Sequence, residues 1–148
     1  MNYTLRNVGV DELHFKMNNV RIEPNTKIQM MPQFVSHVQS LPDNAKIKSV
    51  ILEAKLASTE KEPKPFNFFV RVVGVFECQD VSSSDMDRFV QETVPLLYPY
   101  LRTAVVNLTA TSYQYPSLML PVTFPGQPIK RNNGGNWGIS FGNTDILN

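Results

Sequence analysis

The stretch of residues 66–78 constrains the fold of this chain most strongly, because it reads as a β-strand with apolar side chains on both faces. Successive side chains of a strand point to opposite sides of its sheet. One face here carries Phe66, Phe68, Val70 and Val72, and the other carries Phe69, Val73 and Val75. Both faces must therefore be covered, one by helices of the same chain and the other by a second chain or a ligand. This pattern alone predicts self-association.

Three segments before this strand also alternate apolar and polar residues, which is typical of strands. They cover residues 3–17, with a break near residues 9–12, then 27–41 and 46–58. Turn-forming residues such as Pro24-Asn25 and Pro42-Asp43 separate the segments. Because short connections between consecutive strands favour antiparallel pairing, the first half of the chain predicts a four-stranded antiparallel meander.

The spacing of apolar residues changes to a helical period after residue 81. Ser82-Ser83-Ser84 supplies candidate N-cap residues, and Asp85 and Asp87 fall in the first turn, where acidic side chains stabilise a helix. Pro95 is expected to end this helix and to open a second one, which stops before Tyr115. The predicted fold class is α+β, a four-stranded antiparallel β-sheet meander followed by two helices packed on one face.

The composition predicts one domain and a separate tail. With 148 residues, 42% of them hydrophobic, the chain is long enough to bury a core without disulfides or metals. We expect the domain to span residues 1–125 and an Asn/Gly-rich tail to span residues 126–148. Trp137, Ile139 and Phe141 form a short alternating patch in this tail, which either docks as a strand or stays mobile.

Charge and hydropathy argue against several classes of partner. Fourteen basic and thirteen acidic side chains give a formal charge of +1, so the chain lacks the positive excess of a nucleic-acid binder. No apolar run approaches the roughly 20 residues that cross a bilayer, and the first residues do not read as a signal peptide. Cys78 is the only cysteine, which suits a reducing compartment. We expect a cytoplasmic protein with neither nucleic-acid nor membrane partners.

The sequence contains no pattern of residues that indicates catalysis or metal binding. His14 and His37 lack neighbouring cysteines or carboxylates at metal-ligand spacing, and Cys78 has no histidine near it in sequence. Asp85 and Asp87 have a sufficient structural role at the helix start. We therefore expect neither an enzyme nor a bound metal or cofactor. What remains is an excess of methionine and aromatic residues, which suits a surface that accepts varied partners.

Three short motifs, in this order along the chain, resemble the SecB family of tetrameric export chaperones, which hold preproteins unfolded. Gly74-Val75-Phe76 resembles the family's Gly-Ile-Phe at the end of its fourth strand. Tyr98-Pro99-Tyr100-Leu101-Arg102 resembles its aromatic-Pro-Tyr-Ala-Arg run at the start of the long helix, with a leucine in place of alanine. Leu120-Pro121-Val122-Thr123-Phe124 resembles its Ala-Pro-Val-Asn-Phe segment. The likeness covers residues 4–125 and marks a divergent member.

The resemblance implies a homotetramer, built as a dimer of dimers in which eight strands meet, with clients held in long apolar grooves. The implied activity is that of a holdase, which binds unfolded or extended polypeptide segments without ATP or another cofactor. The implied positions are Phe68, Val70 and Val72 for the oligomer interface, and Phe34, Ser36, Val38 and Phe124 for client binding.

The chain departs from the family where its export members bind the SecA motor. That docking surface uses acidic residues on the sheet, and the matching positions here are Glu12, Lys16 and Phe69, of which only the first is acidic. The helix expected after Phe124 is also missing. These departures favour a chaperone dedicated to one client, such as the antitoxin of a toxin-antitoxin-chaperone system, over an export-linked holdase. The alternative from another class is a non-catalytic oligomeric structural or interaction module that holds no client.

Overall fold

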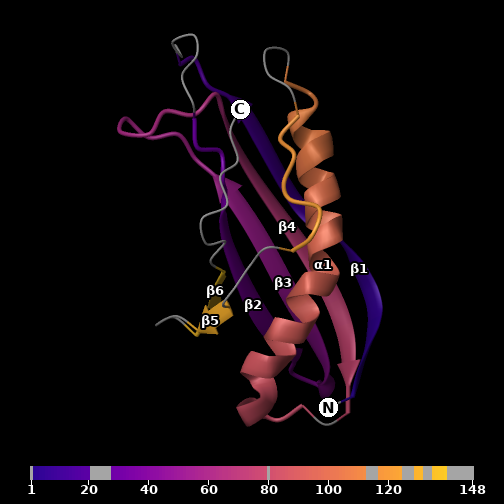
Figure 1. Ribbon diagram of the computed structural model, residues 1–148. Coiled ribbons are helices and arrows are strands. Elements are labelled where there is room, and N and C mark those ends of the chain that lie inside the picture. The colour runs from indigo at the N-terminus through magenta and orange to yellow at the C-terminus, as the bar shows by residue number, and fades with distance from the viewer. Residues whose placement is uncertain are drawn as a thin grey trace.

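The structure is a computed structural model that describes residues 2–20, 28–79, 81–112, 117–124, 129–131 and 135–139. In this part of the chain, one long helix lies along one face of an antiparallel sheet (Figure 1). The strands are β1 (Tyr3–Met17), β2 (Gln33–Leu41), β3 (Asn44–Leu56), β4 (Phe66–Cys78), β5 (Ile129–Arg131) and β6 (Trp137–Ile139). A short 3-10 turn, η1 (Ser83–Asp85), leads into the helix α1 (Met86–Thr109). The predicted α+β class with an antiparallel sheet is confirmed.

The order of strands in the sheet is β1-β4-β3-β2-β6-β5. Strands β2, β3 and β4 form a meander, whereas β1 pairs with β4, with Tyr3 opposite Cys78 and Met17 opposite Phe66. The prediction of a four-stranded meander is therefore wrong in two respects. The connection over residues 18–32 is too long to impose a hairpin between β1 and β2, and two tail strands extend the sheet beyond β2.

The bounds of the strands agree with the sequence pattern in part. β4 covers the residues predicted for it, and its burial alternates along its whole length. β1 is continuous through the predicted break, which the structure shows as a shift of pairing between Val10 and Glu12. β2 begins at Gln33, because residues 28–32 form only an isolated bridge at Gln29 before it. The predicted start at residue 27 lies outside the described residues.

The alternation in β4 separates a buried face from a half-buried one. Phe68, Val70 and Val72 lie on the face beneath α1 and are at most 2% exposed. Phe69 and Val73 lie on the opposite face and are half-buried. Within the described residues, α1 covers the first face, as predicted, and no element covers the second, which is called the open face below.

A single helix replaces the two that were predicted. η1 begins after Ser82, whose backbone N–H donates to the Asp85 carboxylate at 3.3 Å, so the helical segment begins where the sequence indicated. α1 then continues through Pro95 and Pro99, although each proline removes one backbone hydrogen bond at a cost of about 3 kcal/mol. The helix persists because its apolar stripe packs on the sheet on both sides of the prolines. This stripe comprises Phe89, Val90, Val94, Leu97, Tyr98, Leu101 and Val105.

The helix approaches the sheet most closely over Gly74 in β4. A Cβ atom at this position would lie 2.5 Å from Cδ2 of Leu97 and 3.1 Å from Cε2 of Phe76. Leu97 and Phe76 are both fully buried, so neither can move aside easily. The glycine of the Gly74-Val75-Phe76 motif is therefore explained by packing against α1.

Candidate binding surfaces

The two longer motifs of the sequence meet in the structure. Tyr98 and Arg102 are one turn apart on α1, and they donate hydrogen bonds to consecutive carbonyl oxygens of the extended segment 117–124. The Tyr98 hydroxyl donates to Pro121 O at 2.6 Å, and Arg102 Nε donates to Leu120 O at 2.8 Å. Burial raises the pKa of Tyr98 to about 12, so its hydroxyl remains a donor at neutral pH. These contacts fix the segment along the helix (Figure 1).

Segment 117–124 alternates buried and exposed side chains. Leu118 and Leu120 are buried, whereas Met119 and Val122 are exposed. Phe124 is half-buried, with its ring 5.3 Å from that of Tyr98 in an edge-to-face arrangement. The segment therefore presents an apolar ridge to solvent beside α1, although its backbone is held in place.

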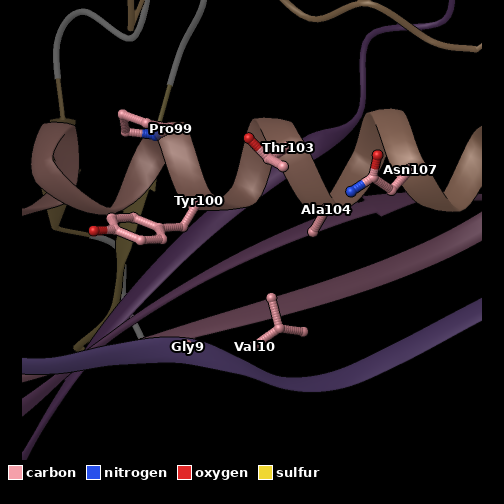
Figure 2. Close-up of a pocket in the computed structure, with 7 residues that line it drawn as sticks. All are labelled: Gly9, Val10, Pro99, Tyr100, Thr103, Ala104 and Asn107. Carbon is pink, nitrogen blue, oxygen red and sulfur yellow. The ribbon is translucent and has the colours of Figure 1, made fainter.

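An open groove of about 520 Å³ lies between the edge strand β1 and α1. Its lining includes Gly9 and Val10 from β1 and Tyr100 and Ala104 from α1. Figure 2 shows Val10 pointing from the strand toward Ala104 on the helix. Tyr100 is 47% exposed and Val10 is 39% exposed, and both line the same groove, so they contribute to one apolar patch.

The apolar surface continues beyond the groove lining. Leu13, on the same face of β1, is 49% exposed, and Leu96 is exposed one turn before Tyr100 on α1. β1 is fifteen residues long, and within the described chain it pairs on one side only. A long edge strand beside exposed apolar residues is a ready site for another polypeptide. Sequence reasoning missed this surface, because Val10 and Leu13 read as ordinary strand residues.

Ion pairs cross the centre of the open face. Arg71 of β4 lies between acids of both neighbouring strands, with Nε 2.9 Å from Asp11 Oδ1 and Nη1 3.8 Å from Glu53 Oε1. The hydrogen bond to Asp11 raises the pKa of Arg71. His37 Nε2 lies 3.2 Å from Glu53 Oε1, and Glu12 lies 3.7 Å from Arg71. These charged side chains lie between the apolar residues of the open face and separate them into smaller patches.

The structure brings the three predicted docking positions to one side of the sheet. Glu12, Lys16 and Phe69 all lie on the open face, near the first residues of β4. Lys16 and Phe69 line a cavity of about 470 Å³ together with His14 and Lys55. Glu12 contacts Arg71 and His14, so its charge is already paired. The charged groups that line this cavity are basic, which is unlike an acidic docking surface.

Two of the predicted client-binding residues are not on a surface. Phe34 is 4% exposed, and Ser36 is buried with its hydroxyl donating to Ile51 O at 2.8 Å. Both point to the helix side of β2, and the tail strand β6 pairs with β2 at these residues. Val38 and Phe124 are half-buried and pack against the core. The expectation of an open groove at Phe34 and Ser36 is therefore corrected.

The predicted oligomer interface also needs correction. Phe68, Val70 and Val72 are buried within one chain beneath α1, so their side chains have no surface left for a second chain. The alternating pattern of β4 identified two apolar faces, but it could not show which face α1 would cover. The most exposed apolar side chains lie instead on β1, on the outer stripe of α1 and on segment 117–124.

Among the described residues, no group of three or more histidines, cysteines, aspartates or glutamates is placed to hold a metal ion. Cys78 is buried, and burial raises the pKa of its thiol, which disfavours the reactive thiolate. In the same part of the chain, no helix has the length and apolar character needed to cross a membrane.

The fold and these surfaces define an α+β protein with one helix on an antiparallel sheet and apolar surface beside an edge strand. The family described as Preprotein translocase subunit SecB matches residues 10–126, so the chain belongs to the SecB family. The predicted family is thus confirmed, and membership supports a chaperone role. None of the curated proteins matches this sequence.

Two solved structures are similar to the chain. One is the Mycobacterium tuberculosis Rv1957 SecB-like chaperone in complex with a ChAD peptide from the Rv1956 HigA1 antitoxin. It has a TM-score of 0.68 and 15% identity, over 82% of this chain and 91% of that chain. The other is a protein of unknown function from Streptococcus agalactiae, with a TM-score of 0.46 and 15% identity, over 82% of this chain and 98% of that chain. The first likeness shows a shared fold.

Proposed function

We propose that this chain is a cytoplasmic chaperone of the holdase type, which binds extended or unfolded polypeptide segments without ATP. Family membership supports the role, and one structural observation carries it: Met119 and Val122 stay exposed along segment 117–124, beside α1. Binding a client removes this apolar area from water, and backbone contacts add affinity without demanding a sequence. The activity needs no catalytic group.

The oligomer is the second part of the proposal. The chain assembles as a homotetramer, a dimer of dimers, and the groove between β1 and α1 takes the second copy. Two β1 edges related by two-fold symmetry satisfy each other's backbone groups while Val10 and Leu13 become buried. This arrangement also explains why a fifteen-residue edge strand can carry exposed apolar residues.

The client surface lies on the other side of α1. It comprises Val38 and Phe124, together with the exposed Met119 and Val122 of segment 117–124. Methionine adapts to different side chains because its thioether is flexible and polarisable. Tyr98 and Arg102 hold the segment in an extended form, so little ordering is needed before a client binds.

The chaperone serves one dedicated client, such as an antitoxin, rather than the general export pathway. The similar Mycobacterium tuberculosis chaperone was solved with an antitoxin peptide, which supports this version. The basic cavity at Lys16 and Lys55 also argues against docking of the SecA motor through negative charge. If the export-linked version held instead, Glu12, Lys16 and Phe69 would be the contact positions on the open face.

A peptide array tests this proposal with the full chain and no nucleotide. Overlapping peptides from unfolded test proteins and from antitoxins are probed, and we expect one short apolar sequence to bind far more strongly than the rest. Val122→Asp places a charge on a residue that is 76% exposed and should weaken binding, whereas Thr123→Asp on its exposed neighbour should not. Similar binding to many peptides would support the export-linked version. Binding to none would contradict the chaperone proposal and favour an oligomeric module without a client.

A further inference from the structure

The tail covers the outer edge of β2. Strands β5 and β6 pair with each other and are called the tail hairpin below, and β6 pairs in turn with β2. Ile139 lies opposite Phe34, and Trp137 lies opposite Ser36. These two β2 residues were matched to the client groove, so a segment of the same chain occupies the place expected for a client.

The tail hairpin is attached by apolar side chains that reach the core, namely Ile129, Trp137 and Ile139, and by polar contacts that converge on one residue of α1. Trp137 is 3% exposed, and its Nε1–H donates to Asp87 Oδ1 at 2.9 Å. The Arg131 guanidinium lies 4.8 Å from the centre of the Trp137 ring and has Nε 3.9 Å from the same Asp87 oxygen. Asp87 and Arg131 are half-exposed or more, so solvent weakens their attraction.

The pairing between the tail hairpin and β2 is short. β6 has three residues and pairs with residues 34–36, whereas β2 has nine. Three-residue strands add little stability on their own, because each cross-strand pair contributes well under about 1 kcal/mol. A client segment that extends along the whole of β2 would form more pairs than β6 does. The client segment expected at this edge is therefore an extended peptide with alternating apolar residues.

We propose that the outer edge of β2 accepts an extended client segment as an added strand, and that the tail hairpin occupies this edge in the free protein. Client binding displaces the tail hairpin and uncovers Phe34 and Ser36, so the hairpin lowers the apparent affinity for every client. When a ligand competes with an internal segment, its apparent Kd equals the intrinsic Kd divided by the fraction of chains in which the edge is free. This inference rests on the proposed function and names its site and its regulation.

Trp137 makes the displacement measurable, because it is the only tryptophan in the chain. The probe is a tryptophan-free peptide of ten residues that alternates valine and threonine, added to the full chain. We expect the fluorescence of Trp137 to shift to longer wavelength as the peptide binds, since a buried indole becomes exposed. Peptide binding itself is followed separately, by the anisotropy of a fluorescein-labelled copy.

Variants of Asp87 and Arg131, the residues in polar contact with Trp137, complete the test. Asp87→Ala removes the acceptor for Trp137 and the partner of Arg131, and we expect it to bind the labelled peptide about tenfold more tightly, the factor typical of losing one charged hydrogen bond. Arg131→Ala removes a half-exposed side chain and leaves the buried Ile129 and Trp137 unchanged, and it should tighten binding by a smaller factor. Arg88→Ala, on the neighbouring helix residue, removes only the ion pair with Glu92 and should bind like the unmodified chain.

The outcomes separate this inference from the proposed function. Peptide binding with an unchanged Trp137 spectrum and equal affinities for all variants would overturn the inference, because the client would then bind elsewhere. Absence of peptide binding by every variant would also overturn the inference, because an added strand pairs through its backbone. The proposed function fails separately, if no peptide of the array binds. A red shift on binding, with Asp87→Ala tighter than Arg88→Ala, supports both.

Discussion

Val70→Arg is expected to leave no folded chain. Val70 is fully buried beneath α1, with Ala54 and Leu13 opposite it on the neighbouring strands. An unpaired buried charge costs about 3–5 kcal/mol, and forcing a larger side chain into a packed core costs about 1–3 kcal/mol more. The sum is comparable with the whole stability of a small domain, about 5–15 kcal/mol.

Circular dichroism and one-dimensional proton spectra would measure this loss directly. The matched control is Val75→Arg, which makes the same change on the same strand but on the half-buried open face. We expect this control to remain folded. A soluble and folded Val70→Arg chain that forms dimers would contradict the burial of this residue and restore it to an oligomer interface.

Val10→Arg is expected to dissociate the oligomer while each chain stays folded. Val10 is exposed in the isolated chain and lines the groove between β1 and α1, so its replacement creates no buried charge in the monomer. In the proposed assembly, the two-fold axis would bring the new charges of two chains close together in an apolar interface. The affinity between chains should fall by several orders of magnitude.

Light scattering coupled to size-exclusion chromatography would show the change in mass. Val122→Arg is the matched control, because Val122 is also exposed but lies on segment 117–124, on the client side of α1. We expect this control to keep the mass of the unmodified chain. An unchanged mass for Val10→Arg would place the oligomer interface elsewhere.

Local patterns predicted individual elements of this fold well. β4 was predicted with its correct bounds because its alternation is strong and turn residues flank it. The start of the helical segment was predicted because Ser82 and Asp85 form a local capping arrangement that depends on no distant contact.

Features that depend on distant contacts could not be predicted in the same way. α1 runs through Pro95 because the sheet stabilises the helix on both sides of it, and this packing is invisible in the local sequence. β1 lies beside β4, although β2 follows it in sequence. Phe34 pairs with Ile139 of β6, more than one hundred residues away in the chain.

The sequence predicted a binding surface, and two of the residues predicted for client binding, Val38 and Phe124, remain in the proposed client surface. The resemblance to the SecB family identified the chaperone class, and family membership is now shown. The positions carried over from the family included Val70 and Ser36, which this structure buries. These residues were assigned by their place in the order of strands. That order does not show which face of the sheet a helix covers or where the tail pairs.

The claim that this chain holds unfolded polypeptides is tested most directly by native mass spectrometry. The full chain is mixed, without nucleotide, with a reduced and alkylated test protein that cannot fold and that carries in its interior the strongest-binding peptide of the array, and in parallel with the same protein in its folded form. We expect a complex with the mass of four chains plus one unfolded polypeptide, and no complex with the folded form. Separate masses for chain and polypeptide in both mixtures would contradict it.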